Sequence, residues 1–418
     1  MFFDLKVSEV RMVAKWEKGN CPTDLIKEIK GKMIINASNQ LSYSLDLPIF
    51  VDALFSCVEH EILLDRQLVY EKFELAIKRL FEEDRLKDTG KILPLFCKLC
   101  EEIHKEKKKY FLVTTINVKE YVFKSRMLNG CKISFYKNIP QKYSSTRRKL
   151  MKIYSEKGIR EQENYQFVVV SVEAGDERTA YRMAMQALDI FRSILHIGFV
   201  KNVNFFSLNM SETYSSNSIV SIGQFHTVHN ENGKNCSDII WVEDFYQEKV
   251  TFKIRNPSIT ENEISIMIRK INKSKFREHI TNALVNYINS IDVNDLESRF
   301  LKLWATFEQL LKSDNSDILV KRISFFFNDR EVSKRVFLSL RKARNISSHT
   351  GKEPYNKEMK NFILALNFEV VIRHFINNHY RYKSLNDFLE FISMTTDLDA
   401  LNKQNKNIRN VKRFIGKG

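Results

Sequence analysis

The residues best suited to chemistry lie between positions 344 and 349, where Arg344 and Asn345 are followed by His349. Asn345 and His349 are four residues apart, so a helix places both side chains on one face. The Asn345 amide can then hydrogen-bond a ring nitrogen of His349 and fix the orientation of the imidazole. Arg344 lies about 140° away from His349 around an ideal helix. A long side chain at a helix end, or a second copy of the chain across a two-fold axis, can close this gap.

This combination of side chains suits the cleavage of RNA. A histidine can remove the proton from a ribose 2′-hydroxyl or protonate the leaving 5′-oxygen. An arginine presents a planar fork to the phosphate and to the charge that grows on it. Neither role needs a metal or another cofactor, and DNA lacks the internal nucleophile. We therefore expect His349 to act as the acid or base, Arg344 as the phosphate clamp and Asn345 as the orienting residue.

The elements that must position these residues are expected to be helices from about 256 to 400. The clearest one covers 296–311 and can begin at Asn294 or Asp295. Its apolar residues recur at steps of three and four: Phe300, Leu303, Trp304, Phe307, Leu310 and Leu311. Five more helices are expected at 262–289, 316–327, 330–346, 355–380 and 384–394. Gly351 can stop the helix that carries the motif, and the short connections favour antiparallel neighbours in a bundle.

The motif Arg344-Asn345-x-x-x-His349 resembles the Arg-x4–6-His signature of HEPN domains, including the polar residue that usually follows the arginine. The helix upstream, over 300–311, resembles the one that precedes the signature in the Apea-like branch of this family. The resemblance covers about 290–395. It implies a helical bundle that dimerises and brings two motifs into one cleft. Since many relatives are metal-independent endoribonucleases of prokaryotic defence and toxin systems, it implies an active site at Arg344, Asn345 and His349.

Further basic and histidine residues are candidates for holding the substrate. A second match to the signature runs from Arg373 to His379 within the expected helix 362–380, and it is either an exposed helix face or part of the same cleft. The basic segment 142–152 contains a tyrosine and either contacts an RNA backbone or forms a solvated loop. The substrate-binding candidates are Lys342, Arg373, His379, Arg147 and Arg148.

The regions that precede the bundle differ in their helix-forming and strand-forming patterns, so the expected fold class is mixed. Residues 1–108 form a mainly helical N-terminal region. Residues 109–255 form an α/β sensor or regulatory domain, in which Asp176 begins a long helix that ends near Leu195. The strand-forming runs of this domain are 110–115, 133–136, 167–172 and 250–254. An all-α HEPN-like bundle over 256–400 and a basic tail over 401–418 complete the chain.

Composition narrows the possible partners. The 418 residues include 67 Lys and Arg against 51 Asp and Glu, so the net charge is +16 and a basic surface should attract nucleic acid first and acidic lipid second. With only 12 Gly and 6 Pro, helices should dominate. The absence of an apolar run of about 18 residues argues against a membrane partner. Six cysteines and an N-terminus unlike a signal peptide fit the reducing cytoplasm.

The sequence thus predicts a homodimeric, metal-independent endoribonuclease in a prokaryotic antiviral or toxin role. No phosphate-binding GxxxxGK[ST] loop, GxGxxG fingerprint, GxSxG elbow or HExxH motif occurs, so ATP hydrolysis, dinucleotide chemistry, serine hydrolysis and zinc proteolysis lack support. The alternative is a non-catalytic HEPN module that binds RNA or protein and dimerises, or a phage sensor. A phage-derived trigger or a regulatory protein would then engage residues 1–255.

Overall fold

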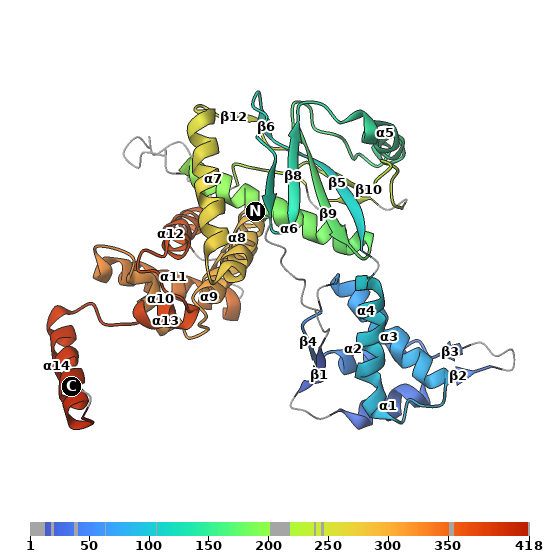
Figure 1. Cartoon of the computed structure of the whole chain (residues 1–418), viewed down its shortest axis with the longest axis horizontal. Coiled ribbons are helices and arrows are strands. Elements are labelled where there is room, and N and C mark those ends of the chain that lie inside the picture. The colour runs from blue at the N-terminus through green and yellow to red at the C-terminus, as the bar shows by residue number, and fades with distance from the viewer. Residues whose placement is uncertain are drawn as a thin grey trace.

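The computed structural model describes residues 13–416, apart from 18–20, 37–40, 63, 106, 201–217, 238–239, 244–245, 351–354 and the side chains of 104, 199–200 and 347–350. Figure 1 shows a helical N-terminal unit beside a sheet that is followed by a bundle of helices. A final helix stands apart from the bundle (Figure 1). The fold is therefore mixed, with helical parts and a sheet-bearing part in the expected order.

The N-terminal unit has a hydrophobic core of its own. It contains four helices, α1 (Thr23–Gly31), α2 (Leu47–Phe55), α3 (Arg66–Glu82) and α4 (Ile92–Lys105). Two small antiparallel pairs join them: β1 (Ala14–Trp16) with β4 (Val58–His60), and β2 (Met33–Ile35) with β3 (Leu41–Tyr43). Phe73 and Phe96 meet edge to face at 5.4 Å in this core. The last helix of this unit, α4, ends at Lys105, and residues from Lys108 onward belong to the central sheet.

The central sheet has six strands, and each neighbouring pair is antiparallel. The strands are β5 (Lys108–Ile116), β7 (Arg126–Leu128), β8 (Cys131–Tyr136), β9 (Gln166–Ala174), β10 (Phe225–His229) and β11 (Trp241–Val242), in the order β11-β10-β5-β9-β8-β7. Two short strands, β6 (Val118–Lys119) and β12 (Phe252–Lys253), pair in parallel outside it. The expected domain of helices and strands has the α+β form, because its strands return by hairpins and long excursions instead of regular crossovers.

Helices cover both faces of this sheet. Helix α6 (Glu177–Val200) begins where expected, since the Asp176 carboxylate accepts hydrogen bonds from the backbone amides of Arg178 and Thr179, both at 2.9 Å. Helix α5 (Gln141–Ser155) lies on the opposite face, where Tyr143 packs with Val113 and Val169. Segment 142–152 is thus a helix and not a solvated loop. Successive side chains of a strand point to opposite faces of the sheet, so each strand offers one set of side chains to α6 and the other to α5.

Within the described residues, the bundle consists of seven helices: α7 (Pro257–Lys273), α8 (Arg277–Ile291), α9 (Leu296–Leu310), α10 (Ser316–Ser324), α11 (Arg330–Thr350), α12 (Lys357–Asn377) and α13 (Leu385–Phe391). Asp295 caps α9 by accepting from the Ser298 amide at 2.7 Å, as expected. The single helix expected over 262–289 is wrong, because Ser274 takes an extended conformation and divides it into α7 and α8. Helix α12 ends before 380, because Asn378 adopts a left-handed conformation.

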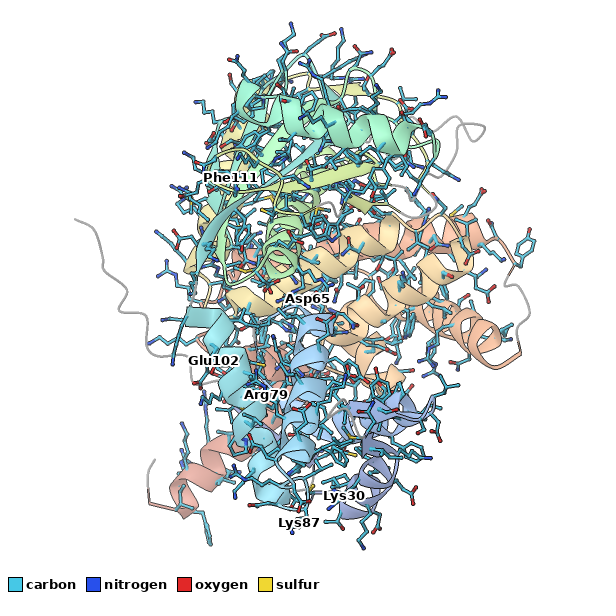
Figure 2. The ribbon with its side chains drawn as sticks, turned by 90° about the vertical axis from the view of Figure 1, so that its right-hand side faces the viewer. Lys30, Asp65, Arg79, Lys87, Glu102 and Phe111 are labelled. Carbon is cyan, nitrogen blue, oxygen red and sulfur yellow. The ribbon has the colours of Figure 1, made fainter. Side chains whose placement is uncertain are left out.

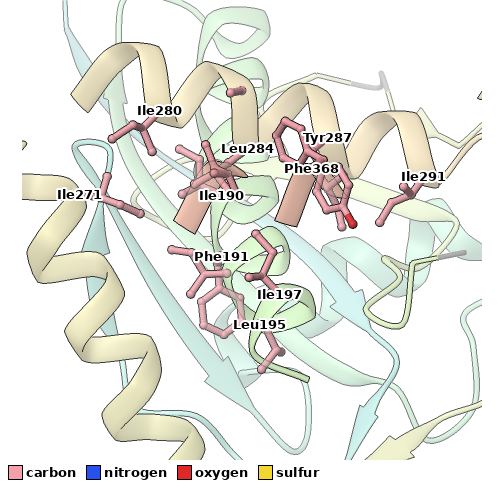
Figure 3. Packing of buried hydrophobic residues seen from close by; sticks show 14 of the residues in the cluster. Ile190, Phe191, Leu195, Ile197, Ile271, Ile280, Leu284, Tyr287, Ile291 and Phe368 are labelled. Carbon is pink, nitrogen blue, oxygen red and sulfur yellow. The ribbon is translucent and has the colours of Figure 1, made fainter. Parts of the chain in front are cut away.

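The sheet and the bundle share one core. Figure 3 shows Ile190 of α6 beside Leu284 of α8. On the other side of α6, Phe191 packs on Phe135 of β8 at 4.9 Å. The Ser193 hydroxyl donates to the Leu284 carbonyl at 2.6 Å, and Tyr287 stacks on Phe368 at 4.4 Å. The boundary near 255 therefore separates two architectures that are packed around a common interior. Among the helices of the described residues, none combines the length and the apolar character needed to cross a bilayer.

Polar contacts join the N-terminal unit to the sheet-bearing part. Figure 2 shows Asp65 at the end of the unit that meets this part. Its backbone amide donates to the Thr179 hydroxyl at 3.0 Å, and Glu71 pairs with Arg178 at 2.9 Å. Helix α6 therefore contacts the N-terminal unit at its start and the bundle along its length.

Candidate functional site

Helix α11 carries the predicted motif near its C-terminal end. Its inner face holds Phe337, Leu340 and Ala343, which are all buried. Phe337 meets Phe307 of α9 edge to face at 5.9 Å, so the two helices pack side by side. This packing leaves Arg344 half-buried beside α9 and turns Asn345 to the surface.

The Arg344 guanidinium is held by two acceptors. Its Nη2 lies 3.5 Å from Glu308 Oε1 on α9, and its Nη1 donates to Asn345 Oδ1 at 3.3 Å. The same Glu308 oxygen accepts a hydrogen bond from Trp304 Nε1 at 2.8 Å. Trp304 is buried, so it fixes the carboxylate that in turn orients the arginine. About a third of the Arg344 side chain remains exposed (32%), which leaves part of the fork open to a ligand.

Asn345 contacts the arginine through its amide oxygen. The expected hydrogen bond from Asn345 to the His349 ring stays a prediction, because the His349 side chain lies outside the described residues. The backbone of 349 belongs to α11, so the two positions do lie one helical turn apart. Gly351, the expected stop signal, also lies outside the described residues, and the helix ends at Thr350.

A shallow hollow of about 540 Å³ runs along the outer side of α11 next to this motif. Arg341, Lys342 and Asn345 contribute its polar lining. Lys342 is exposed, whereas Arg341 pairs with Asp317 of α10. Cations beside an arginine fork suit a polyanionic chain that follows the helix. Lys342 lines this hollow, and its role in substrate binding stays a prediction.

The two residues of the second match to the signature, Arg373 and His379, do not lie on one surface. Arg373 points into the fold, where its Nη2 donates to the carbonyl of Ile197 on α6, and burial lowers its pKa. His379 is exposed and lies beyond the end of α12. The helix ends between them, so they do not share a helical face. The expected substrate contact of Arg373 is wrong, because its guanidinium is engaged between α12 and α6.

Arg147 is a second correction. Its side chain is 1% exposed, and its donors serve the carbonyls of Val113 and Phe225, at 2.8 and 2.9 Å, and the carboxylate of Glu161. Burial lowers the pKa of Arg147, an effect opposed by Glu161. An interior arginine cannot reach an RNA backbone. Arg148 is exposed on the same helix, but α5 lies on the far side of the sheet from the bundle (Figure 1).

Two buried histidines in β10 were not among the predicted functional residues. His226 Nε2 faces Glu243 at 3.0 Å and its Nδ1 faces the Thr114 hydroxyl at 2.6 Å. Since a carboxylate only accepts, Nε2 carries the proton and Nδ1 accepts from the threonine. Burial lowers the pKa of His226, whose side chain is fully enclosed. This group resembles a catalytic relay in composition but has no exposed nucleophile, so we interpret it as structural.

A second hollow lies away from the motif. It has a volume of about 650 Å³ and lies where α3, α6 and α8 meet. Asp189 lines its inner end, where burial raises the pKa of this carboxyl to about 6 in spite of its contact with Arg192 at 2.8 Å. Sequence patterns give no sign of this hollow, because its walls come from four separate parts of the chain.

Comparison with protein-family profiles, with curated proteins and with solved structures returns no match to this chain. The function of this chain is therefore inferred from its residues and their geometry.

Proposed function

We propose that the chain is a metal-independent endoribonuclease of HEPN type that acts in prokaryotic antiviral defence or as a toxin. The observation that carries the proposal is the arrangement of Arg344 on α11. Its guanidinium is oriented by Glu308 and Asn345 and is still partly exposed. A preorganised cation of this kind stabilises charge that develops on a phosphate.

The reaction follows from the roles of the three side chains. One imidazole of His349 takes the proton of a ribose 2′-hydroxyl, and the 2′-oxygen forms a bond to phosphorus. The bond from phosphorus to the 5′-oxygen breaks, and an imidazole returns a proton to that oxygen. Arg344 binds the non-bridging oxygens while Asn345 holds the fork and the ring in place. The products are a 2′,3′-cyclic phosphate and a 5′-hydroxyl.

A homodimer supplies the second histidine in this proposal. The long α11 presents residue 349 near its end, where a partner helix related by two-fold symmetry brings in the same residue. We propose the cytoplasm as the compartment, since all six cysteines are free thiols. Residues 1–255 would receive a phage-derived trigger or a regulatory protein.

The test is cleavage of RNA by the full chain in the presence of a chelator. We expect His349→Ala and Arg344→Ala each to lower the cleavage rate by at least about a hundredfold, as loss of an acid/base or a charge-stabilising group does. Lys334→Ala provides the control, because Lys334 is exposed on the first half of the same helix. Full activity in both motif variants contradicts the proposal.

One observation favours the alternative of a non-catalytic binding module. The ion pair between Arg344 and Glu308 joins α11 to α9, and a contact of this kind also serves a purely structural role. A module of this kind binds RNA or a protein partner and leaves RNA intact. Tight binding without cyclic phosphate ends, unchanged by His349→Ala, identifies it.

A further inference from the structure

Helix α14 (Leu398–Phe414) is a complete helix that buries none of its side chains among the residues that the structure describes. Asp397 caps it by accepting from the backbone amide of Asp399 at 2.9 Å. Figure 1 shows it beyond α13, away from the bundle. A lone helix of this length is marginal in water, so a surface that it binds would stabilise it. The expected basic tail is therefore largely a helix, with two distinct sides.

One side of α14 is apolar. At about 100° per residue, Leu401, Ile408, Val411 and Ile415 fall within a sector roughly 80° wide. Ile408 is 56% exposed and Val411 58% exposed, while Phe414 beside this sector is 91% exposed. Large apolar side chains left in water on one stripe mark an interaction surface.

The other side of α14 is basic. Lys406, Arg409 and Arg413 fall within a sector roughly 60° wide that faces away from the apolar stripe. Lys403 and Lys412 lie at its two borders with the stripe. No acidic residue follows Asp399 in the sequence. The partner of this helix must therefore offer negative charge together with an apolar layer.

A second copy of the chain does not meet this requirement. The segment from 397 onward contains six of the 67 basic residues and two of the 51 acidic residues, so the rest of the chain is net basic as well. Two α14 helices packed stripe to stripe would place Lys403 and Lys412 of both copies together without a counter-charge. Like charges across such a contact destabilise it.

A nucleic acid meets only half of the requirement. Phosphates would pair with the basic side, but the apolar stripe would remain in water. We propose that α14 lies on the surface of a membrane rich in anionic lipid. Its apolar stripe enters the boundary between headgroups and acyl chains, and the border lysines reach the lipid phosphates. This surface helix, unlike a spanning segment, attaches the chain to one leaflet, and the inference does not depend on nuclease activity.

The test is flotation of the full chain with vesicles of equal parts phosphatidylserine and phosphatidylcholine, compared with phosphatidylcholine alone. We expect binding to the anionic vesicles only, weakened by salt. The double variant Ile408→Asn/Val411→Asn should lower the partition coefficient by about tenfold or more, and so should Lys406→Gln/Arg413→Gln. Val332→Asn is the matched control, since this valine is 55% exposed on α11.

Three results overturn the inference. The first is failure of the full chain to float with anionic vesicles, and the second is equal flotation of the α14 variants and the control. The third is loss of RNA binding or of dimer mass in the α14 variants without vesicle binding, which would assign the helix to RNA or to a second copy. RNA cleavage is measured separately, without vesicles. Failure of the nuclease proposal can therefore be distinguished from failure of the membrane proposal.

Discussion

Arg344 is the residue on which the proposed chemistry depends most, and its position is set by a carboxylate on another helix. Glu308 accepts from the buried Trp304 at 2.8 Å and faces Arg344 at 3.5 Å. Glu308 and Arg344 are both partly exposed (22% and 32%), so this pair contributes little to stability. Its value is geometric, because it selects one orientation of a flexible side chain. Glu308 is therefore a positioning residue in the proposed reaction.

Glu308→Ala separates positioning from stability. Without the carboxylate, Arg344 samples more rotamers, and we expect the single-turnover cleavage rate to fall by about tenfold. RNA binding should stay equal or become tighter, because a negative charge beside the phosphate site is removed. Glu308→Gln keeps an acceptor for Trp304, so its cleavage rate should lie between the rates of the unchanged chain and of Glu308→Ala. If the cleavage rate and the melting temperature fall together, Glu308 only supports the fold. If the cleavage rate rises, Glu308 restrains activity.

At the level of elements, strand β10 contributes two buried histidines to the sheet. His229 Nδ1 faces the Gly233 carbonyl at 3.1 Å, and its Nε2 faces the Thr227 hydroxyl at 2.8 Å. A carbonyl only accepts, so Nδ1 carries the proton and the neutral ring satisfies both partners. Burial lowers the pKa of His229 to about 4. The sheet is thus built around neutral imidazoles.

Stability should fall as the pH drops below about 6.5, the usual pKa of histidine in an unfolded chain. The unfolded state then binds a proton that folded His229 does not bind until about pH 4. The free energy of unfolding therefore decreases between these values, by at most about 1.4 kcal/mol per pH unit for this group. Urea unfolding at several pH values measures the slope. His229→Gln should flatten it, whereas the exposed His379→Gln should not, and equal slopes in both variants would exclude this cause.

Local patterns predicted several elements but not how they meet. The strands at 110–115, 133–136 and 167–172 are confirmed because β-branched and aromatic runs favour a buried sheet. The N-cap of α6 is confirmed because Asp176 can accept from the first amides. The break at Ser274 was missed, since neither Gly nor Pro marks it. Arg147 was misplaced because a basic cluster is typical of a surface, and only the folded sheet provides its carbonyl acceptors.

The same limit applies to the candidate site. The spacing of Arg344 and Asn345 predicts neighbouring side chains at the end of a helix, and the two do contact each other. Their partner Glu308 is distant in sequence, and the pattern around it predicts only a helix with an apolar stripe. Tertiary packing decides which polar residue of that helix faces the motif.

At the scale of the whole molecule, α6 connects the N-terminal unit with the bundle. Arg182 donates to the Leu64 carbonyl at 3.1 Å, and Thr179 accepts from the Asp65 amide. Just before this helix, Gly175 passes so close to α4 that a Cβ on it would lie 2.3 Å from the Ile103 carbonyl oxygen. Helix α6 also packs on α8, so it is the element through which the proposed trigger of the N-terminal unit is expected to act on the bundle.

Gly175→Ala tests this connection. The added methyl group meets backbone that cannot rotate away, so α4 and the start of α6 must separate. We expect a loss of about 1–3 kcal/mol, the usual cost of overpacking. Limited proteolysis should cut earlier between the N-terminal unit and the sheet. Gly31→Ala is the control, because nothing lies within 4 Å of its added Cβ. If Gly175→Ala melts and is cleaved like the control, the N-terminal unit does not dock on α6 in solution, and α6 does not connect the proposed trigger to the bundle.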